Sequence, residues 1–157
     1  MSMTASTVTL ARQEARSFEA YLAQPGEPRR PAILVLSDMF GLNEPIRAVA
    51  DHYASRGHAA LVPNLFWRSD IPGAISYDDP QHATAWARLK ALDLDAVSAD
   101  MRAATDGLRA QPLSHGKVAA IGFCGGGRFA YLAAVRCGVD AAASLYGLGI
   151  SQHLGEI

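Results

Sequence analysis

The stretch that decides the fold is KVAAIGFCGGGRFAYLAAV, residues 117–135. An apolar run of strand length ends near Gly122, and a second apolar run begins after three consecutive glycines. Cys124 stands at the junction, inside the pattern Gly-x-Cys-x-Gly. Between a strand and a helix this pattern is typical of a nucleophile elbow, the tight turn that presents a catalytic serine or cysteine.

The glycines of this pattern have a physical reason. At a tight strand-to-helix turn, side chains two residues before and after the nucleophile would clash with neighbouring backbone. The N-terminus of the following helix would favour the thiolate of Cys124, and the N–H of Gly125 would face the oxyanion of a tetrahedral intermediate. Two alternatives stay open: an inert buried cysteine, or a phosphate-binding turn, although neither common phosphate motif is present.

Apolar runs without polar alternation predict strands that are buried on both faces. The predicted strands are 7–11, 17–25, 32–37, 58–63, 117–123 and 139–147, and the predicted helices are 45–57, 81–110 with a break at Asp93–Asp95, and 127–137. This order predicts one α/β domain over 1–157 with a doubly wound, mostly parallel sheet. Residues 64–80, rich in Pro, Gly, Asp and Ser, predict a long surface loop that carries aromatic residues, of a kind that often binds ligands.

Composition narrows the class of protein. The chain has 157 residues, 50% of them hydrophobic, and a formal net charge of -1 without a basic stripe, which argues against nucleic-acid binding. The apolar runs are too short to span a membrane, and the first residues lack the features of an export signal. Cys124 and Cys137 form no CxxC pair, which argues against a zinc site or a disulfide framework. We therefore expect a cytoplasmic protein with reduced thiols.

Several motifs of this chain together resemble those of the dienelactone hydrolase (carboxymethylenebutenolidase) family. The motifs are DMFGLNEPIR (38–47), HAALVPNLFWR (58–68), GFCGGG (122–127) and YGLG (146–149). The resemblance runs from about residue 17 to the end of the chain. It implies an α/β-hydrolase fold and a Cys-His-Asp triad that hydrolyses lactones or small carboxylic esters, with no metal or organic cofactor.

The resemblance also implies roles for individual residues. Cys124 would attack the lactone carbonyl, and the backbone N–H groups of Met39 and Gly125 would form the oxyanion hole. Asp38 stands where the family usually has a glutamate whose carboxylate helps to form the thiolate; Asp is one methylene shorter, and a simple turn role is the alternative. The side chains expected to line the substrate pocket are Phe40, Phe66, Arg68, His82, Trp86 and Tyr146. The aromatic ones among them are equally plausible core residues, and His82 occupies a position that the family fills with a substrate-binding arginine.

The family continues beyond the point where this chain stops, and its C-terminal third carries the triad's Asp and His. None of the five histidines matches the catalytic one; they are His52, His58, His82, His115 and His153. We therefore expect a fragment that lacks the C-terminal third and exposes an apolar sheet edge, with the missing segment or a second copy as its partner. The alternatives to a hydrolase are a non-catalytic small-ligand-binding or redox-responsive domain, and an unstable half-domain.

Overall fold

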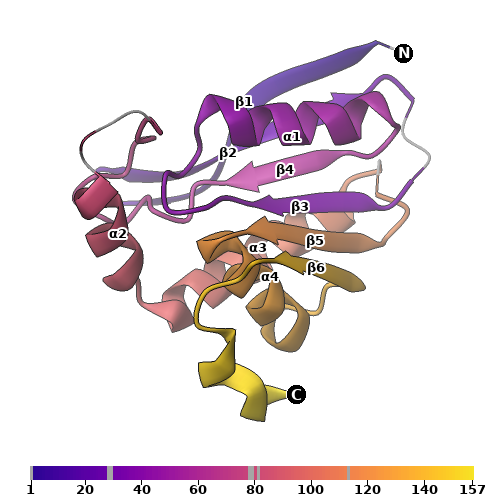
Figure 1. Ribbon diagram of the computed structural model, residues 1–157. Helices are drawn as coiled ribbons and strands as arrows, with labels where there is room; N and C mark the ends of the chain where they lie inside the picture. Colours follow the sequence, from indigo (N-terminus) through magenta and orange to yellow (C-terminus); the bar gives the residue numbers. More distant parts are fainter. Residues whose placement is uncertain (1, 28–29, 78–79, 81, 113) are drawn as a thin grey trace.

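A six-stranded sheet forms the centre of the molecule, with helices on both of its faces (Figure 1). The structure is a computed structural model that describes residues 2–157 except 28–29, 78–79, 81 and 113. The strands are β1 (Met3–Gln13), β2 (Arg16–Pro25), β3 (Ala32–Leu36), β4 (Ala60–Pro63), β5 (Val118–Phe123) and β6 (Ala141–Leu145). The helices are α1 (Glu44–Ser55), α2 (His82–Lys90), α3 (Leu94–Ala110), α4 (Gly125–Arg136) and the 3-10 helix η1 (Ile150–Glu156).

The strands follow the order β1-β2-β4-β3-β5-β6. β4, β3, β5 and β6 are parallel, while the β1–β2 hairpin joins the sheet antiparallel to β4. The predicted doubly wound, mostly parallel sheet is confirmed. Leu36 pairs with Gly122, and Gly122 pairs with Ser144. The loops that follow β3, β5 and β6 therefore leave the sheet at the carboxyl ends of the parallel strands, where α/β folds bind their ligands.

Each face of the sheet is covered by a different set of helices. α1 packs on one face through Ile46, Ala50 and Ala54. α3 and α4 cover the opposite face and build the larger core (Figure 1). The predicted inward positions of α3 (Val97, Met101, Ala104, Leu108) and α4 (Phe129, Leu132, Ala133) are all buried. Helical periodicity alone therefore identified the packing faces of both helices.

One helix boundary differs from the expectation in an informative way, and one predicted break between helices is confirmed. α4 begins at Gly125, directly after Cys124 and two residues earlier than predicted. The predicted break in 81–110 is confirmed: α2 ends at Lys90, and the Asp93 carboxylate caps α3 by accepting hydrogen bonds from the N–H groups that follow it. Residue 81, where the helix was expected to start, lies outside the described residues.

The described part of 64–80 contains no helix or strand, as expected for a loop. The expectation that its aromatic side chains lie at the surface is wrong for Phe66 and Trp67, because both are buried in the core. Phe18 on β2 stacks on Trp67 with ring centroids 5.5 Å apart, which ties this loop to the sheet. The loop therefore begins as part of the core and reaches the surface only after residue 67.

β6 is the strand at the edge of the sheet, next to β5. All five of its residues are exposed, and so are large apolar side chains that follow it, among them Tyr146, Leu148 and Leu154. The predicted exposed apolar edge is confirmed. Within the described ranges, no helix is long and apolar enough to cross a membrane.

Candidate active site

Cys124 sits at the junction of β5 and α4 in a backbone conformation that non-glycine residues rarely adopt. Its φ is 55° and its ψ is -117°. Such a conformation costs about 1–3 kcal/mol and persists only where the surroundings enforce it. Here the Cys124 N–H donates to the Leu145 carbonyl at 3.1 Å, and the Cys124 carbonyl accepts from the Gly127 N–H at 3.0 Å. β6 and α4 together therefore hold the strained turn in place.

The glycines around Cys124 are required by close backbone approaches. A Cβ on Gly122 would lie 1.8 Å from the Gly126 carbonyl oxygen, and a Cβ on Gly126 would lie 2.2 Å from the Leu36 carbonyl oxygen. Neither contact can be relieved by rotating a side chain, since both involve backbone atoms. The predicted reason for the Gly-x-Cys-x-Gly pattern is confirmed: it lets the elbow pack directly against the carboxyl end of β3.

Two backbone N–H groups lie in segments that meet at the carboxyl ends of β3 and β5. Gly125 is the first residue of α4, and Met39 belongs to the loop that follows β3. Within the described part of the chain, neither N–H group donates a hydrogen bond to the protein. The α4 N-terminus also has no side-chain cap and no acidic residue in its first turn, so its partial positive charge is uncompensated. The arrangement can stabilise an anion beside Cys124.

Asp38 forms its hydrogen bonds with the loop that follows β3 (residues 37–43, the β3 loop) and with Tyr77, rather than with the thiol of Cys124. One carboxylate oxygen accepts the Phe40 N–H at 2.8 Å, and the other accepts the Tyr77 hydroxyl at 2.7 Å. Burial first, and then the bond to Asp38, raise the pKa of Tyr77 to about 12. No hydrogen bond joins Asp38 to Cys124 among the residues described. The turn role of Asp38 is therefore observed, while its role toward the thiolate stays a prediction.

Three of the predicted pocket residues, Phe40, His82 and Tyr146, lie around the β3 loop and Tyr77. Phe40 packs edge-on against Tyr77 and His82, with ring centroids 4.5 and 5.1 Å away. Tyr146, which is 72% exposed and has a φ of 42°, contributes to raising the pKa of Tyr77. Tyr77 was missed by sequence reasoning, although it belongs to the aromatic-bearing loop that had been singled out. The structure thus brings an aromatic group to the carboxyl ends of β3 and β6.

The other three predicted pocket residues lie elsewhere. Phe66 is completely buried, with the Arg88 guanidinium 4.0 Å from its ring centroid, so it offers no surface to a substrate and its assignment to the pocket is corrected. Arg68 forms an ion pair with the Asp100 carboxylate, and its guanidinium lies over the ring of Trp67. Its positive charge is therefore already paired within the protein. Trp86 on α2 is 40% exposed, and the Lys90 ammonium lies 5.7 Å from its ring centroid.

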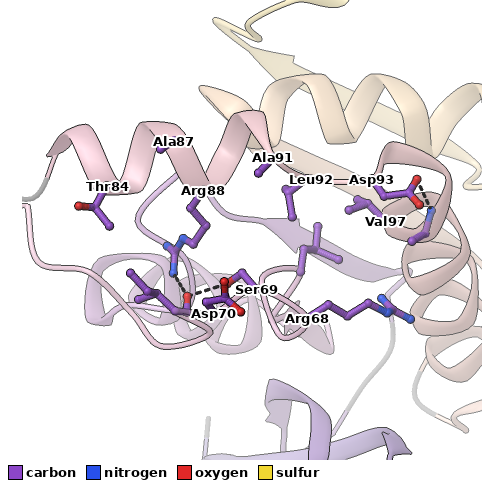
Figure 2. Close-up of a pocket in the computed structure, with 13 residues that line it drawn as sticks. Arg68, Ser69, Asp70, Thr84, Ala87, Arg88, Ala91, Leu92, Asp93 and Val97 are labelled. Atoms are coloured by element: carbon purple, nitrogen blue, oxygen red, sulfur yellow. Dashed lines mark hydrogen bonds between the residues drawn. The ribbon is translucent and has the colours of Figure 1, made fainter.

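A pocket of about 460 Å³ lies between α2, the 65–71 segment and the start of α3 (Figure 2). Arg68, Thr84, Arg88 and Asp93 are among its lining residues, and Cys124 is not. The pocket is therefore separate from Cys124. Arg88 was missed by sequence reasoning, since no motif or periodicity distinguishes it from an ordinary helix arginine.

No hydrogen bond within the described ranges joins a histidine to Cys124. His82 bonds the Tyr77 carbonyl, His58 bonds the Pro31 carbonyl, and the His153 Nδ1 lies 2.9 Å from the Glu156 carboxylate. No group of three or more His, Cys, Asp or Glu side chains that would hold a metal ion occurs in the part of the chain that the structure describes. A general base for Cys124 is therefore not provided by these histidines in this arrangement.

Residues 18–157 match the model of a protein family described as the dienelactone hydrolase family. The chain belongs to the dienelactone hydrolase family. Carboxymethylenebutenolidase of Pseudomonas putida is 30% identical over 151 residues, which are 96% of this chain and 64% of that protein. Carboxymethylenebutenolidase 1 of Cupriavidus pinatubonensis is 28% identical over 156 residues, or 99% of this chain and 67% of that protein. The chain thus spans about two-thirds of the length of these curated relatives.

Solved structures of the family agree with the fold. A Klebsiella pneumoniae protein provisionally named a dienelactone hydrolase superposes with a TM-score of 0.79 at 24% identity, covering 94% of this chain and 61% of that one. A dienelactone hydrolase-like promiscuous phosphotriesterase from metagenomic libraries gives a TM-score of 0.64 at 30% identity, covering 85% of this chain and 54% of that one. The α/β-hydrolase fold expected from the motifs is confirmed.

Proposed function

We propose that this chain carries the nucleophile and oxyanion hole of a hydrolase that cleaves lactones or small carboxylic esters through a cysteine acyl-enzyme. The single observation that carries the proposal is the positive φ of Cys124, enforced at a strand-to-helix turn beside an uncapped helix N-terminus. Backbone strain of this kind concentrates at functional sites. Membership of the dienelactone hydrolase family supports an ester or lactone as the substrate.

The proposed first half-reaction follows from the arrangement at the elbow. The Cys124 thiolate attacks the carbonyl carbon, and the electron pair of the carbonyl moves onto oxygen. The N–H groups of Met39 and Gly125 would hold that oxyanion, a type of interaction worth about 2.7–4 kcal/mol per donor. Collapse of the intermediate expels the alkoxide, which takes up a proton from solvent water, and leaves a thioester on Cys124. With a lactone the alkoxide stays attached to the acyl group, so the ring opens.

The second half-reaction needs a base to activate water. No described histidine forms a hydrogen bond with Cys124, while the curated relatives are longer than this chain. We propose that the base belongs to the part of the fold that the relatives have and this chain does not span, docked against the exposed edge of β6. By itself the chain would then form the acyl-enzyme once and release it slowly.

The expected surroundings of the reaction also remain proposals. Among the residues predicted to contact the substrate, Tyr146 is 72% exposed and Trp86 is 40% exposed, and Phe40 packs against Tyr77. A reducing compartment such as the cytoplasm would keep Cys124 reactive, and both cysteines are free in this structure. The proposed chemistry calls for no bound cofactor, because the thiolate, the backbone N–H groups and the proposed base supply its steps.

The test is acetylation by p-nitrophenyl acetate, followed by intact mass and peptide mapping. The proposal predicts one acetyl group on Cys124 and about one equivalent of nitrophenolate. The Cys124→Ala variant should show neither, whereas Cys137→Ala, which changes the buried second cysteine, should behave as wild type. An unmodified Cys124 in folded protein would refute the proposal and favour the ligand-binding or redox-responsive alternative. Aggregation of the chain would favour the unstable half-domain.

A further inference from the structure

Arg88 on α2 is a buried arginine that donates its hydrogen bonds, within the described part of the chain, to backbone carbonyls. Only 6% of its surface is exposed. Figure 2 shows the side chain extending from α2 toward the segment that carries Ser69 and Asp70. Burial lowers the pKa of Arg88 to about 10, which still leaves the guanidinium charged at neutral pH. Burying a charged group is unfavourable unless it makes good hydrogen bonds, so the contacts of this side chain need an explanation.

The guanidinium joins two loops through these carbonyls. One terminal nitrogen donates to the carbonyls of Ile71 and Gly73, at 2.8 and 2.6 Å. The other donates to the Met39 carbonyl at 2.6 Å. The same group lies over the Phe66 ring, with the guanidinium carbon 4.0 Å from the centroid. These contacts hold the β3 loop against the loop formed by residues 64–80, and they leave the guanidinium little freedom to move.

Met39 is the residue of the β3 loop that supplies the proposed oxyanion donor. Its carbonyl, which Arg88 binds, and its N–H lie on the two peptide planes that flank one Cα, so fixing the carbonyl restricts how the N–H is directed. On the other side the loop is fixed by the Asp38 carboxylate, which accepts from the Phe40 N–H and from Tyr77. Arg88 also lies tightly against Gly41 in the same loop, since a Cβ there would be 3.2 Å from its terminal nitrogen.

We propose that Arg88 is a positioning residue that holds the Met39 peptide so that its N–H points at the reacting carbonyl oxygen. The inference rests on the proposed function and adds a residue to it. Arg88 does not touch the substrate. It acts through the β3 loop, in the way that a group packed behind an oxyanion hole preserves donor geometry without reorganisation during the reaction.

The test compares two reactions of the same thiol. Acetylation by p-nitrophenyl acetate passes through an oxyanion, whereas alkylation by iodoacetamide displaces iodide and needs no oxyanion hole. In Arg88→Met, a change of similar length, we expect the acetylation rate constant to fall about 10- to 100-fold and the alkylation rate constant to change less than about 3-fold. The ratio of the two rates reports donor geometry, because a general loss of thiol access or reactivity would slow both reactions.

Arg109→Met is the matched control. Arg109 also donates to two loop carbonyls, those of Gly116 and Gly138, but at the opposite end of the sheet. Its removal should leave the acetylation-to-alkylation ratio at the wild-type value. Arg88→Lys, which keeps the charge and can reach part of the same carbonyl set, should recover part of the ratio. If Arg88→Met does not fold, as judged by far-UV circular dichroism, the Arg88→Lys ratio decides alone, and a wild-type value refutes the inference.

The outcomes separate this inference from the proposed function. An acetylated wild type with an unchanged ratio in folded Arg88→Met overturns the positioning role and leaves the nucleophile intact. A fall in both rates by the same factor assigns Arg88 to general stability and also overturns the inference. A wild type that alkylates but does not acetylate at Cys124 refutes the proposed function itself.

Discussion

Replacing Gly126 by alanine tests whether the elbow depends on close packing against β3. An added Cβ would lie 2.2 Å from the Leu36 carbonyl oxygen and 2.5 Å from the Ser37 carbonyl oxygen. Both atoms belong to the backbone at the carboxyl end of β3, where Leu36 also pairs with Gly122 of β5. The clash therefore cannot be relieved by a side-chain rotation, and the start of α4 must move away from β3.

The size of the effect follows from that geometry. Restoring an ordinary contact of 3.4 Å from 2.2 Å requires a movement of about 1.2 Å at a close-packed junction. Overpacking usually costs about 1–3 kcal/mol, and a backbone clash belongs at or above the upper end of that range. We expect the free energy of unfolding to fall by about 3 kcal/mol or more.

Urea unfolding followed by far-UV circular dichroism measures this loss. Gly107→Ala is the matched control, since Gly107 lies inside α3 and a Cβ added there would meet no neighbouring atom within 4 Å among the described residues. The same chemical change there should stabilise the protein by about 0.5–1 kcal/mol through helix propensity. If Gly126→Ala unfolds at the wild-type urea midpoint while Gly107→Ala shifts as expected, the reasoning about the elbow is refuted.

Two further variants test interactions away from the elbow. Asp100→Ala removes the acceptor of the Trp67 indole N–H (2.8 Å) and the counter-charge of Arg68, so urea unfolding should show a loss of about 2–4 kcal/mol; a loss below about 0.5 kcal/mol would contradict this. Hydrogen bonds from Lys117, the Val118 N–H and Arg109 hold the pKa of Asp140 well below its usual value of 3.8. The contribution of ionised Asp140 to the free energy of unfolding is therefore present above pH 3.8 and is lost as the pH falls below 3.8. Asp140→Asn should flatten the acid limb of a plot of thermal midpoint against pH, and an unchanged acid limb would count against the interaction.

The fold was largely predictable because its signals are local. The uninterrupted apolar strands identified a buried parallel sheet, and the periodicity of α3 and α4 identified their packing faces. The Gly-x-Cys-x-Gly pattern was informative because a side chain at either glycine would clash with backbone, at Gly122 with Gly126 of the same turn and at Gly126 with the end of β3. The strand order was not predictable in the same way, because the position of β4 between β2 and β3 depends on contacts between distant segments.

The candidate site was only partly predictable, because several of its contacts pair one side chain with backbone far away in the sequence. Arg88 binds the carbonyl of Met39, 49 residues earlier, and no residue type marks a carbonyl as an acceptor in the sequence. Tyr77 reaches Asp38 across 39 residues in the same way. Phe66 was assigned to the pocket because an aromatic residue in a long loop suits either a binding surface or the core; its ring lies in the core.

The measurement that tests the central claim most directly is a crystal structure of the protein acetylated at Cys124. The account predicts that the thioester carbonyl oxygen lies between the N–H groups of Met39 and Gly125, within about 3.2 Å of both nitrogens. A carbonyl oxygen directed toward solvent, with either nitrogen more than about 4 Å away, would contradict the oxyanion hole and with it the proposed chemistry.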